Sequence, residues 1–308
     1  MFAKVVVVVR KTRLEELIER FNTRGQAKFY LEHAGGDFGE YEAEHDAYQR
    51  ALERVRRGLD LGLQVQVIGR ELVPSFSFTP QDLVVTLGQD GLVANTAKYV
   101  GGQPIVAVNP DPARFDGVLL PFLPAAARAA AGAVLAGRAR VREVTMAEIR
   151  LNDGQRLLGF NDLFIGARTH VSARYRIRFA GAVEPQSSSG VLVSTGAGST
   201  GWLSSVFTMA AGVAALAGGQ GGHALQLGWE DRRLVFVVRE PFVSKHSRAG
   251  IVAGLVEPSD SVVLESLMPA GGVVFSDGME ADYLEFNAGA IAIVRGAEQR
   301  ARLVVGAA

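Results

Sequence analysis

The chain has 308 residues, of which 32 are Lys or Arg and 32 are Asp or Glu, so its formal net charge is zero. A neutral chain lacks the basic excess typical of proteins that bind nucleic acid or anionic membranes, and a phosphate site would have to be a local pocket. The sequence contains no cysteine, which excludes disulfides, thiolate catalysis and cysteine-ligated metals.

The first apolar run, Val5–Val9, is too short for the apolar part of a signal peptide and ends at Arg10 and Lys11. Five successive β-branched residues instead predict a strand buried on both faces. No stretch approaches the ~20 apolar residues that span a membrane. We therefore expect a soluble, cytoplasmic protein with no membrane or nucleic-acid partner.

Strand and helix patterns alternate through the first third of the chain. Strands are predicted at Val5–Val9, Leu63–Ile68, Leu83–Leu87 and Pro104–Val108, and helices at Arg13–Arg20, Asp46–Leu59 and Leu92–Val100. This alternation predicts an α/β domain with a mainly parallel sheet and helices on both faces, which we place at residues 1–124.

The pattern changes after Asn109–Pro112. Residues Pro121–Pro124 open an alanine-rich helix that runs to about Gly137 and could act as a hinge. The strands predicted beyond it are Val141–Ile149, Phe160–Ile165, Tyr175–Phe179, Gly190–Ser194, Leu234–Val238, Val262–Leu267 and Val273–Phe275. Many short strands with glycine and asparagine turns predict an antiparallel β domain, at residues 125–285. The glycine-rich insert Ala210–Gly222 is expected to be a loop plus a short helix.

An acidic residue, Asp90, lies in the turn Gly88-Gln89-Asp90-Gly91, where the third predicted strand meets a helix. Open α/β sheets bind ligands at the carboxyl ends of their strands, and the first N–H groups of a helix can hold phosphate. Glycine lets the backbone approach a ligand closely. We therefore predict a catalytic role for Asp90, with Gly88, Gln89 and Gly91 against the ligand. The alternative is an ordinary turn.

Two later segments complete a pattern with this turn: Phe160–Gly166, which contains Asn161-Asp162, and the small-residue stretch Ser194–Trp202. In this order, the three segments resemble the three motifs of the ATP-dependent NAD kinase family. The resemblance covers nearly the whole chain and is closest to the mitochondrial-type branch. Further segments shared with that branch are Lys11–Arg13, Val108–Asn109 with Asp111–Pro112, Ser188–Gly190 and Arg239–Pro241.

The resemblance implies transfer of the γ-phosphoryl group of ATP, with Mg²⁺, to the 2′-hydroxyl of NAD, giving NADP. It also implies an N-terminal α/β domain, a C-terminal β domain, a site in the cleft between them, and at least a homodimer. A C-terminal segment, residues 286–308, would return to the first domain. Phosphoryl transfer needs positioning, charge neutralisation and a carboxylate that accepts or orients the proton, and Asp90 can supply the carboxylate. The metal ligands are not identified.

On the same resemblance, Asn161 and Asp162 contact the adenosine of NAD. A carboxylate suits ribose hydroxyls or an adenine amine and disfavours a bound phosphate. The alternative for this pair is a cap on a turn at a strand start. Asp277-Gly278 resembles an Asp-Gly turn of the family, and for this turn a structural role is expected at least as much as a functional one.

Dinucleotide contacts are also implied for Thr200, Trp202 and Ser205, and the aromatic residue among them is implied to reach across a subunit interface. Their alternative is a flexible loop of small residues. Lys11 and Arg13 would meet the phosphates of ATP at the end of the first strand. Equally, they could be solvated charges at a helix start.

Two residues depart from the family pattern: Gln89 stands at a glycine position and Leu92 at a threonine position. If the turn needs a positive φ at residue 89, glutamine costs about 1–2 kcal/mol there. The lost hydroxyl removes a phosphate or capping contact. One alternative function is therefore a catalytically weak sensor of NAD(H) or nucleotide.

Another alternative is a related-fold kinase of a different hydroxyl substrate, against which Asn161-Asp162 and Ser194–Thr200 argue. The sequence leaves open whether the donor is ATP or polyphosphate and whether NADH is accepted.

Overall fold

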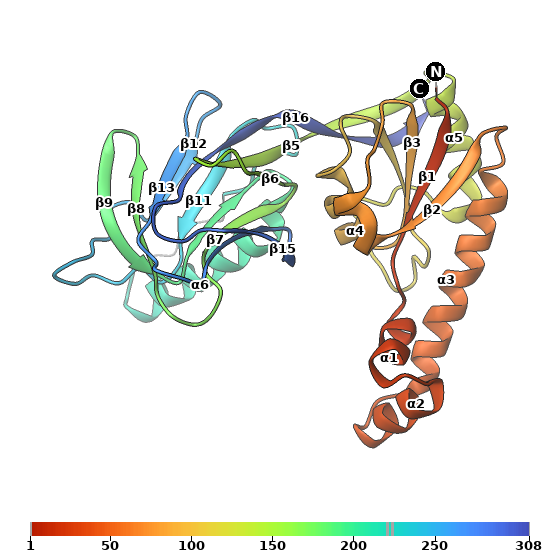
Figure 1. Ribbon diagram of the computed structural model, residues 1–308, viewed down its shortest axis with the longest axis horizontal. Coiled ribbons are helices and arrows are strands. Elements are labelled where there is room, and N and C mark those ends of the chain that lie inside the picture. Colours follow the sequence, from red (N-terminus) through yellow and green to blue (C-terminus); the bar gives the residue numbers. More distant parts are fainter. Residues whose placement is uncertain (1, 220–221, 223–224, 308) are drawn as a thin grey trace. The chain divides into compact units, whose positions relative to one another are not determined.

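The computed structural model describes residues 2–219, 222 and 225–307, and its chain forms two compact units (Figure 1). The first consists of Met1–Arg142 together with Arg302–Ala308, and the second of Glu143–Ala301. Residues 125–142 thus lie in the first unit rather than beyond the predicted boundary at 124. Of the predicted returning segment, residues 302–308 belong to the first unit and residues 286–301 to the second.

The first unit is built on a parallel sheet, as predicted. Its strand order is β2 (Gln64–Gly69), β1 (Lys4–Val9), β3 (Asp82–Leu87) and β4 (Pro104–Val108), and every neighbouring pair is parallel. The end of β16 (Ile291–Ala307) adds to β4, again in parallel. All six residues of β3 are buried, as expected for a strand covered on both faces.

Helices α3 (Phe38–Gly58) and α5 (Ala127–Leu135) share one hydrophobic core with β1, β3 and β4. The alanine-rich helix, preceded by the 3₁₀ turn Pro124–Ala126, therefore packs inside the first unit, because its small side chains allow a close approach to the sheet. The remaining elements of this unit are α1 (Arg13–Phe21), α2 (Arg24–His33), α4 (Asp90–Ala97) and the 3₁₀ helix η1 (Arg70–Ser75).

Helix α2 is not predicted from the sequence, and α3 begins eight residues before the predicted start at Asp46. The glycines between residues 34 and 40 suggest breaks in helical structure, but in the structure they have different roles. Gly35 has a φ of +80° just after α2, whereas Gly39 lies in the first turn of α3 and donates its N–H to the Asp37 side chain. A glycine in the first helical turn does not end a helix.

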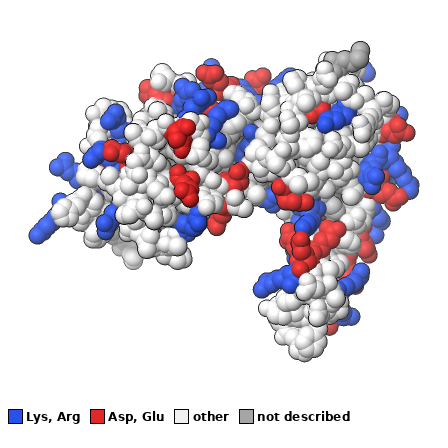
Figure 2. Space-filling model, viewed as in Figure 1, with Lys and Arg blue, Asp and Glu red and all other residues white. Residues whose placement is uncertain are grey.

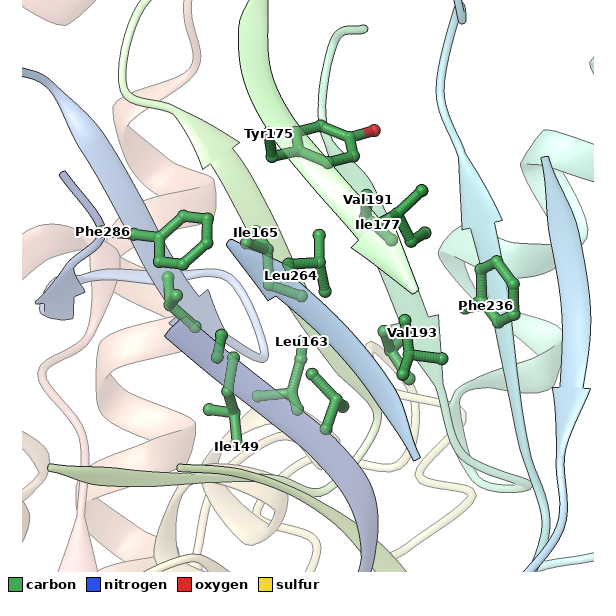
Figure 3. Close-up of a cluster of buried hydrophobic side chains, with 14 of the residues drawn as sticks. Ile149, Leu163, Ile165, Tyr175, Ile177, Val191, Val193, Phe236, Leu264 and Phe286 are labelled. Carbon is green, nitrogen blue, oxygen red and sulfur yellow. The ribbon is translucent and has the colours of Figure 1, made fainter. Parts of the chain in front are cut away.

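The second unit is an antiparallel β domain, which confirms the predicted fold class. One sheet has the order β12 (Ala253–Val256), β11 (Leu234–Val238), β10 (Val191–Ser194), β7 (Asp162–Ala167), β14 (Gly272–Ser276) and β15 (Met279–Glu285). The other strands are β16, β13 (Val262–Ser266), β8 (Ala173–Phe179), β9 (Ala182–Ser188), β5 (Ala139–Leu151) and β6 (Arg156–Gly159). Between the sheets lies a core to which Leu163, Ile165, Tyr175 and Phe236 contribute (Figure 3).

The predicted loop and short helix at Ala210–Gly222 are corrected by the structure. Helix α6 is continuous over Trp202–Leu216, after the 3₁₀ turn η3 (Gly198–Thr200). The alanines of α6 have a high helix propensity, which offsets the low propensity of Gly212 within the helix. Residues 220–221 of the insert lie outside the described residues. Among the described residues, one helical segment, Gly198–Leu216, is by length and composition long and apolar enough to cross a membrane, which the sequence pattern did not indicate.

Candidate functional site

In the first unit, Asp90 is the first residue of α4 and is partly exposed. The helix starts two residues before the predicted Leu92. An acidic side chain in a first helical turn is stabilised by the helix dipole. The Asp90 Oδ1 atom accepts a hydrogen bond from the backbone N–H of Leu119, at 2.6 Å. The carboxylate is therefore held by the segment that follows β4.

The backbone at Gln89 excludes the strain considered above. Its φ is −95° and its ψ is 169°, an extended conformation that suits any residue at an N-cap. The condition of a positive φ at this position is therefore not met, and the glutamine carries no backbone penalty.

The second departure, Leu92, is buried, and its side chain lies against Gly88. A Cβ atom at Gly88 would stand 2.7 Å from the Leu92 Cδ2 atom, so a larger residue there would require the Leu92 side chain to move. In contrast, apart from its chain neighbours and the backbone of its own helix, no described atom lies within 4 Å of a Cβ placed on Gly91. The turn is thus filled on the Leu92 side and open at Gly91.

Both basic residues predicted to meet phosphates have partners within the chain. The Nζ atom of Lys11 lies 2.7 Å from Glu19, and this hydrogen bond raises the pKa of the lysine. The guanidinium of Arg13 pairs with the buried Glu44, which raises the pKa of Arg13. A phosphate would have to compete with these carboxylates.

A third basic residue, Arg10, was not singled out in the sequence. Its Cδ atom would lie 3.6 Å from a Cβ on Gly88, so its side chain runs directly beside the turn. The signal that could have found it is its place immediately after a buried parallel strand, at the edge where such sheets bind ligands.

In the second unit, the turn that contains Asn161 and Asp162 is held by Asp277. The carboxylate of Asp277 accepts the backbone N–H groups of Phe160, Asn161 and Asp162, at 2.9, 2.6 and 3.2 Å. The N–H of Asp277 donates to the carbonyl of Asp162 at 3.0 Å. Asp277 itself has a φ of +52°. The three charge-assisted hydrogen bonds that this carboxylate accepts stabilise the positive φ of Asp277.

The carboxylate of Asp162 is poorly satisfied by the protein. Its Oδ1 atom is buried and accepts no hydrogen bond from the described residues. Burial raises the pKa of Asp162 from its ordinary value of 3.8 to about 7; the charge of Asp277 adds to this rise, and hydrogen bonding from Ser194 opposes it. A buried acceptor without a donor is costly, and a ligand that donates to it would relieve the cost.

The third segment packs directly on this turn. The Thr195 N–H donates to the Asn161 carbonyl at 2.9 Å, and its hydroxyl donates to the Phe160 carbonyl at 2.6 Å. A Cβ on Gly198 would stand 2.3 Å from the backbone carbonyl oxygen of Asn161, and one on Gly196 would stand 1.8 Å from the backbone carbonyl oxygen of Gly228. These glycines are required for close packing, so the start of the segment is a fitted element rather than a flexible loop.

Farther along, Thr200 and Ser205 are exposed, whereas Trp202 is half-buried. The indole of Trp202 stacks on Phe164 with centroids 5.7 Å apart, and the Arg239 guanidinium lies 5.2 Å from the indole centroid. A single chain does not test the implied reach of Trp202 across a subunit interface, which stays a prediction.

The predicted residues that the structure brings together therefore form one group within each unit. Gly88–Gly91 gathers in the first unit with Arg10 beside it, and Asn161-Asp162 joins Thr195–Gly198 in the second. Among the residues that the structure describes, no three or more His, Asp or Glu side chains are placed to hold a metal ion.

Solved structures of two kinases resemble this chain over nearly its full length and are among those that do. An NAD kinase from Archaeoglobus fulgidus in complex with ATP has 17% identity and a TM-score of 0.55, over 97% of this chain and 93% of that chain. Yeast NADH kinase complexed with NADH has 16% identity and a TM-score of 0.56, over 99% of this chain and 84% of that chain. No protein-family model and no curated protein sequence matches. At these identities the likeness shows the fold: the chain has the fold of the NAD kinases.

Proposed function

We propose that this protein is an NAD kinase, which transfers the γ-phosphoryl group of Mg-ATP to the 2′-hydroxyl of NAD and releases NADP and ADP. The observation that carries the proposal is the Asp162 carboxylate, whose buried Oδ1 atom lacks a hydrogen-bond donor. A ribose hydroxyl or an adenine amine supplies such a donor, whereas a phosphate would be repelled. The solved neighbours were crystallised with ATP and with NADH, which supports nucleotide ligands.

Asp90 has the role of general base in this proposal. Its Oδ1 atom is occupied by the Leu119 N–H, which fixes the carboxylate and leaves the other oxygen to meet the acceptor hydroxyl. The open space at Gly91 and the N–H groups of the first turn of α4 would receive the phosphoryl group. Mg²⁺, carried by ATP, would neutralise charge on the phosphates.

Turnover separates this proposal from a nucleotide sensor and from another kinase. The protein is incubated with Mg-ATP and NAD, and NADP is measured with an NADP-specific dehydrogenase. We expect NADP from NAD, and parallel reactions with NADH and with polyphosphate define acceptor and donor. NAD binding without NADP formation would support the sensor, whereas ADP release that depends on a different hydroxyl compound would support the other kinase. We also propose at least a homodimer, as the resemblance implies, and a cytoplasmic location.

Replacing Gln89 with glycine is expected to change kcat by less than about tenfold, or ~1.4 kcal/mol. The reason is that Gln89 already has an extended N-cap conformation and makes no side-chain capping bond. Initial rates at saturating NAD and ATP measure the effect. A large gain would show that the glutamine suppresses activity, and a large loss would show that its amide binds a ligand.

Binding of NAD is expected to change the fluorescence of Trp202. The indole is half-buried in a stack with Phe164 and Arg239, so a neighbouring ligand would alter its environment. Trp229 is the other tryptophan of the chain, and Trp229→Phe isolates the signal. Trp202→Ala should raise the KM for NAD. A flat titration with unchanged kinetics would assign Trp202 a structural role.

A further inference from the structure

We propose that Arg10 binds phosphate in this site, and that its guanidinium holds phosphoryl oxygens of the nucleoside triphosphate that donates the transferred group. The inference rests on the proposed function for the identity of the donor. Its geometric basis lies wholly within the first unit.

Arg10 follows β1, the strand that pairs with β3, and the last residue of β1, Val9, lies opposite Leu87. The next residue on the β3 side is Gly88, and the Arg10 Cδ atom would lie 3.6 Å from a Cβ there. The arginine stem therefore passes beside the turn that leads to Asp90. A larger residue at position 88 would meet this stem as well as Leu92.

The position of Arg10 is fixed by two aromatic rings and a hydrogen-bond relay. Its guanidinium carbon lies 5.9 Å from the Tyr48 centroid and 5.6 Å from that of Phe115. The Tyr48 hydroxyl accepts the Arg10 N–H at 3.0 Å and donates to the Leu87 carbonyl at 2.8 Å. Helix α3, which carries Tyr48, thus ties the ends of β1 and β3 together. Burial raises the pKa of Tyr48 to about 12, so its hydroxyl keeps its proton over the physiological range.

Arg10 shares its carboxylate partner with a second guanidinium group. Buried Glu44 accepts the Nη2 atom of Arg10 at 3.0 Å and also pairs with Arg13. The two guanidinium groups of Arg10 and Arg13 therefore share one buried carboxylate, and Glu40 adds an electrostatic attraction to Arg13. Lys11, by contrast, is neutralised by Glu19.

The hydrogen-bonding capacity of Arg10 is also incompletely used. Its Nη1 atom donates to the Lys11 carbonyl at 3.3 Å, but its buried Nε atom donates to no acceptor among the described residues. The side chain is 13% exposed. A guanidinium has five N–H donors in a planar fork that fits phosphate oxygens. A phosphate beside Gly88 would supply an acceptor for Nε and a further negative charge for the two guanidinium groups.

The test compares Arg10→Met and Arg10→Lys with the wild type in calorimetric titrations of Mg-ATP, magnesium tripolyphosphate and NAD. Arg10→Met should weaken ATP and tripolyphosphate binding by about tenfold to a hundredfold, as expected for charge-assisted hydrogen bonds. NAD affinity should stay within about twofold. Arg10→Lys keeps the charge but loses the planar fork, so its loss should be intermediate.

Two matched variants separate phosphate binding from a structural role. Arg57→Met removes an exposed arginine of helix α3, where it pairs with Glu53, and should leave all three affinities unchanged. Arg13→Met removes the other partner of Glu44 and should cost clearly less ATP affinity than Arg10→Met. Equal losses for Arg13 and Arg10, or equal losses of ATP and NAD, would overturn the inference. If Arg10→Met does not fold, a wild-type tripolyphosphate affinity in Arg10→Lys would overturn it.

Failure of the inference is distinguishable from failure of the proposed function. A protein that binds Mg-ATP through Arg10 but forms no NADP would contradict the NAD kinase reaction and retain the phosphate site. A protein that forms NADP with a KM for ATP unaffected by Arg10→Met would retain the reaction and contradict the role of Arg10.

Discussion

Replacing Asp162 with asparagine is expected to stabilise the folded protein above pH 7 while removing most of its NAD affinity. In the folded protein, burial raises the pKa of this carboxyl from 3.8 to about 7. The stabilising contribution of a group with a raised pKa is fully present below its unfolded pKa and is lost as pH rises through the folded pKa. At 1.36 kcal/mol per pKa unit, this rise corresponds to a loss of about 4 kcal/mol between pH 4 and pH 7.

Denaturant unfolding at pH 5 and pH 8 measures the stability difference between Asp162→Asn and the wild type, which should be larger at pH 8. Calorimetry with NAD should show binding weakened by a few kcal/mol, because an amide replaces the carboxylate that accepts the ligand's donor. Asp153→Asn is the matched control, since hydrogen bonds from Gln155 lower the pKa of Asp153 and its replacement should bring no such gain. Equal stability of Asp162→Asn and wild type at both pH values would show that the buried Asp162 carboxylate does not destabilise the folded protein.

Replacing Asp90 with asparagine is expected to lower kcat by about 10²–10⁴-fold, the usual contribution of a general base. Asparagine keeps an oxygen that can accept the Leu119 N–H, so the turn and the fold should persist. Binding of NAD and Mg-ATP should change little.

Initial rates and ligand titrations of Asp90→Asn measure this prediction, and Asp116→Asn is the control because Asp116 is an exposed carboxylate of the segment that holds Asp90. Turnover close to that of the wild type would make Asp90 a turn residue and would remove its proposed role.

The sequence predicts the fold class because long apolar runs and short strands with glycine turns have clear periodicities. It predicts less well where tertiary contacts decide. Because Gln89 stands at a glycine position of the family pattern, the sequence suggested backbone strain there, but the backbone at this position is extended. Helix α2 is stabilised by a small cluster of Leu14, Ala27 and Phe38, which only the folded chain brings together.

The candidate site shows the same division. The motifs point to Asn161, Asp162 and the third segment. The raised pKa of Asp162, however, depends on its burial and on Asp277, which is more than a hundred residues away in the sequence. Arg10 was missed because a basic residue after a strand is common. Its significance depends on Tyr48, Phe115 and Gly88, which lie in different parts of the chain.

The surface is consistent with local rather than distributed recognition of phosphate. Figure 2 shows basic and acidic side chains interspersed over the visible face, without a broad area of one sign. This agrees with equal numbers of basic and acidic residues in the chain. Phosphate binding is therefore expected to depend on individual placed groups such as Arg10 and the start of α4.

The most direct measurement of the proposed reaction follows a label from the γ-phosphoryl group of ATP. Wild-type protein is incubated with γ-labelled Mg-ATP and NAD, and the dinucleotide product is isolated and tested with an NADP-specific dehydrogenase. We predict that the label appears in NADP, one equivalent per ADP formed, and that Asp90→Asn suppresses its appearance. Label released only as inorganic phosphate, or a dinucleotide without label despite bound NAD, would contradict the assignment of this protein as an NAD kinase.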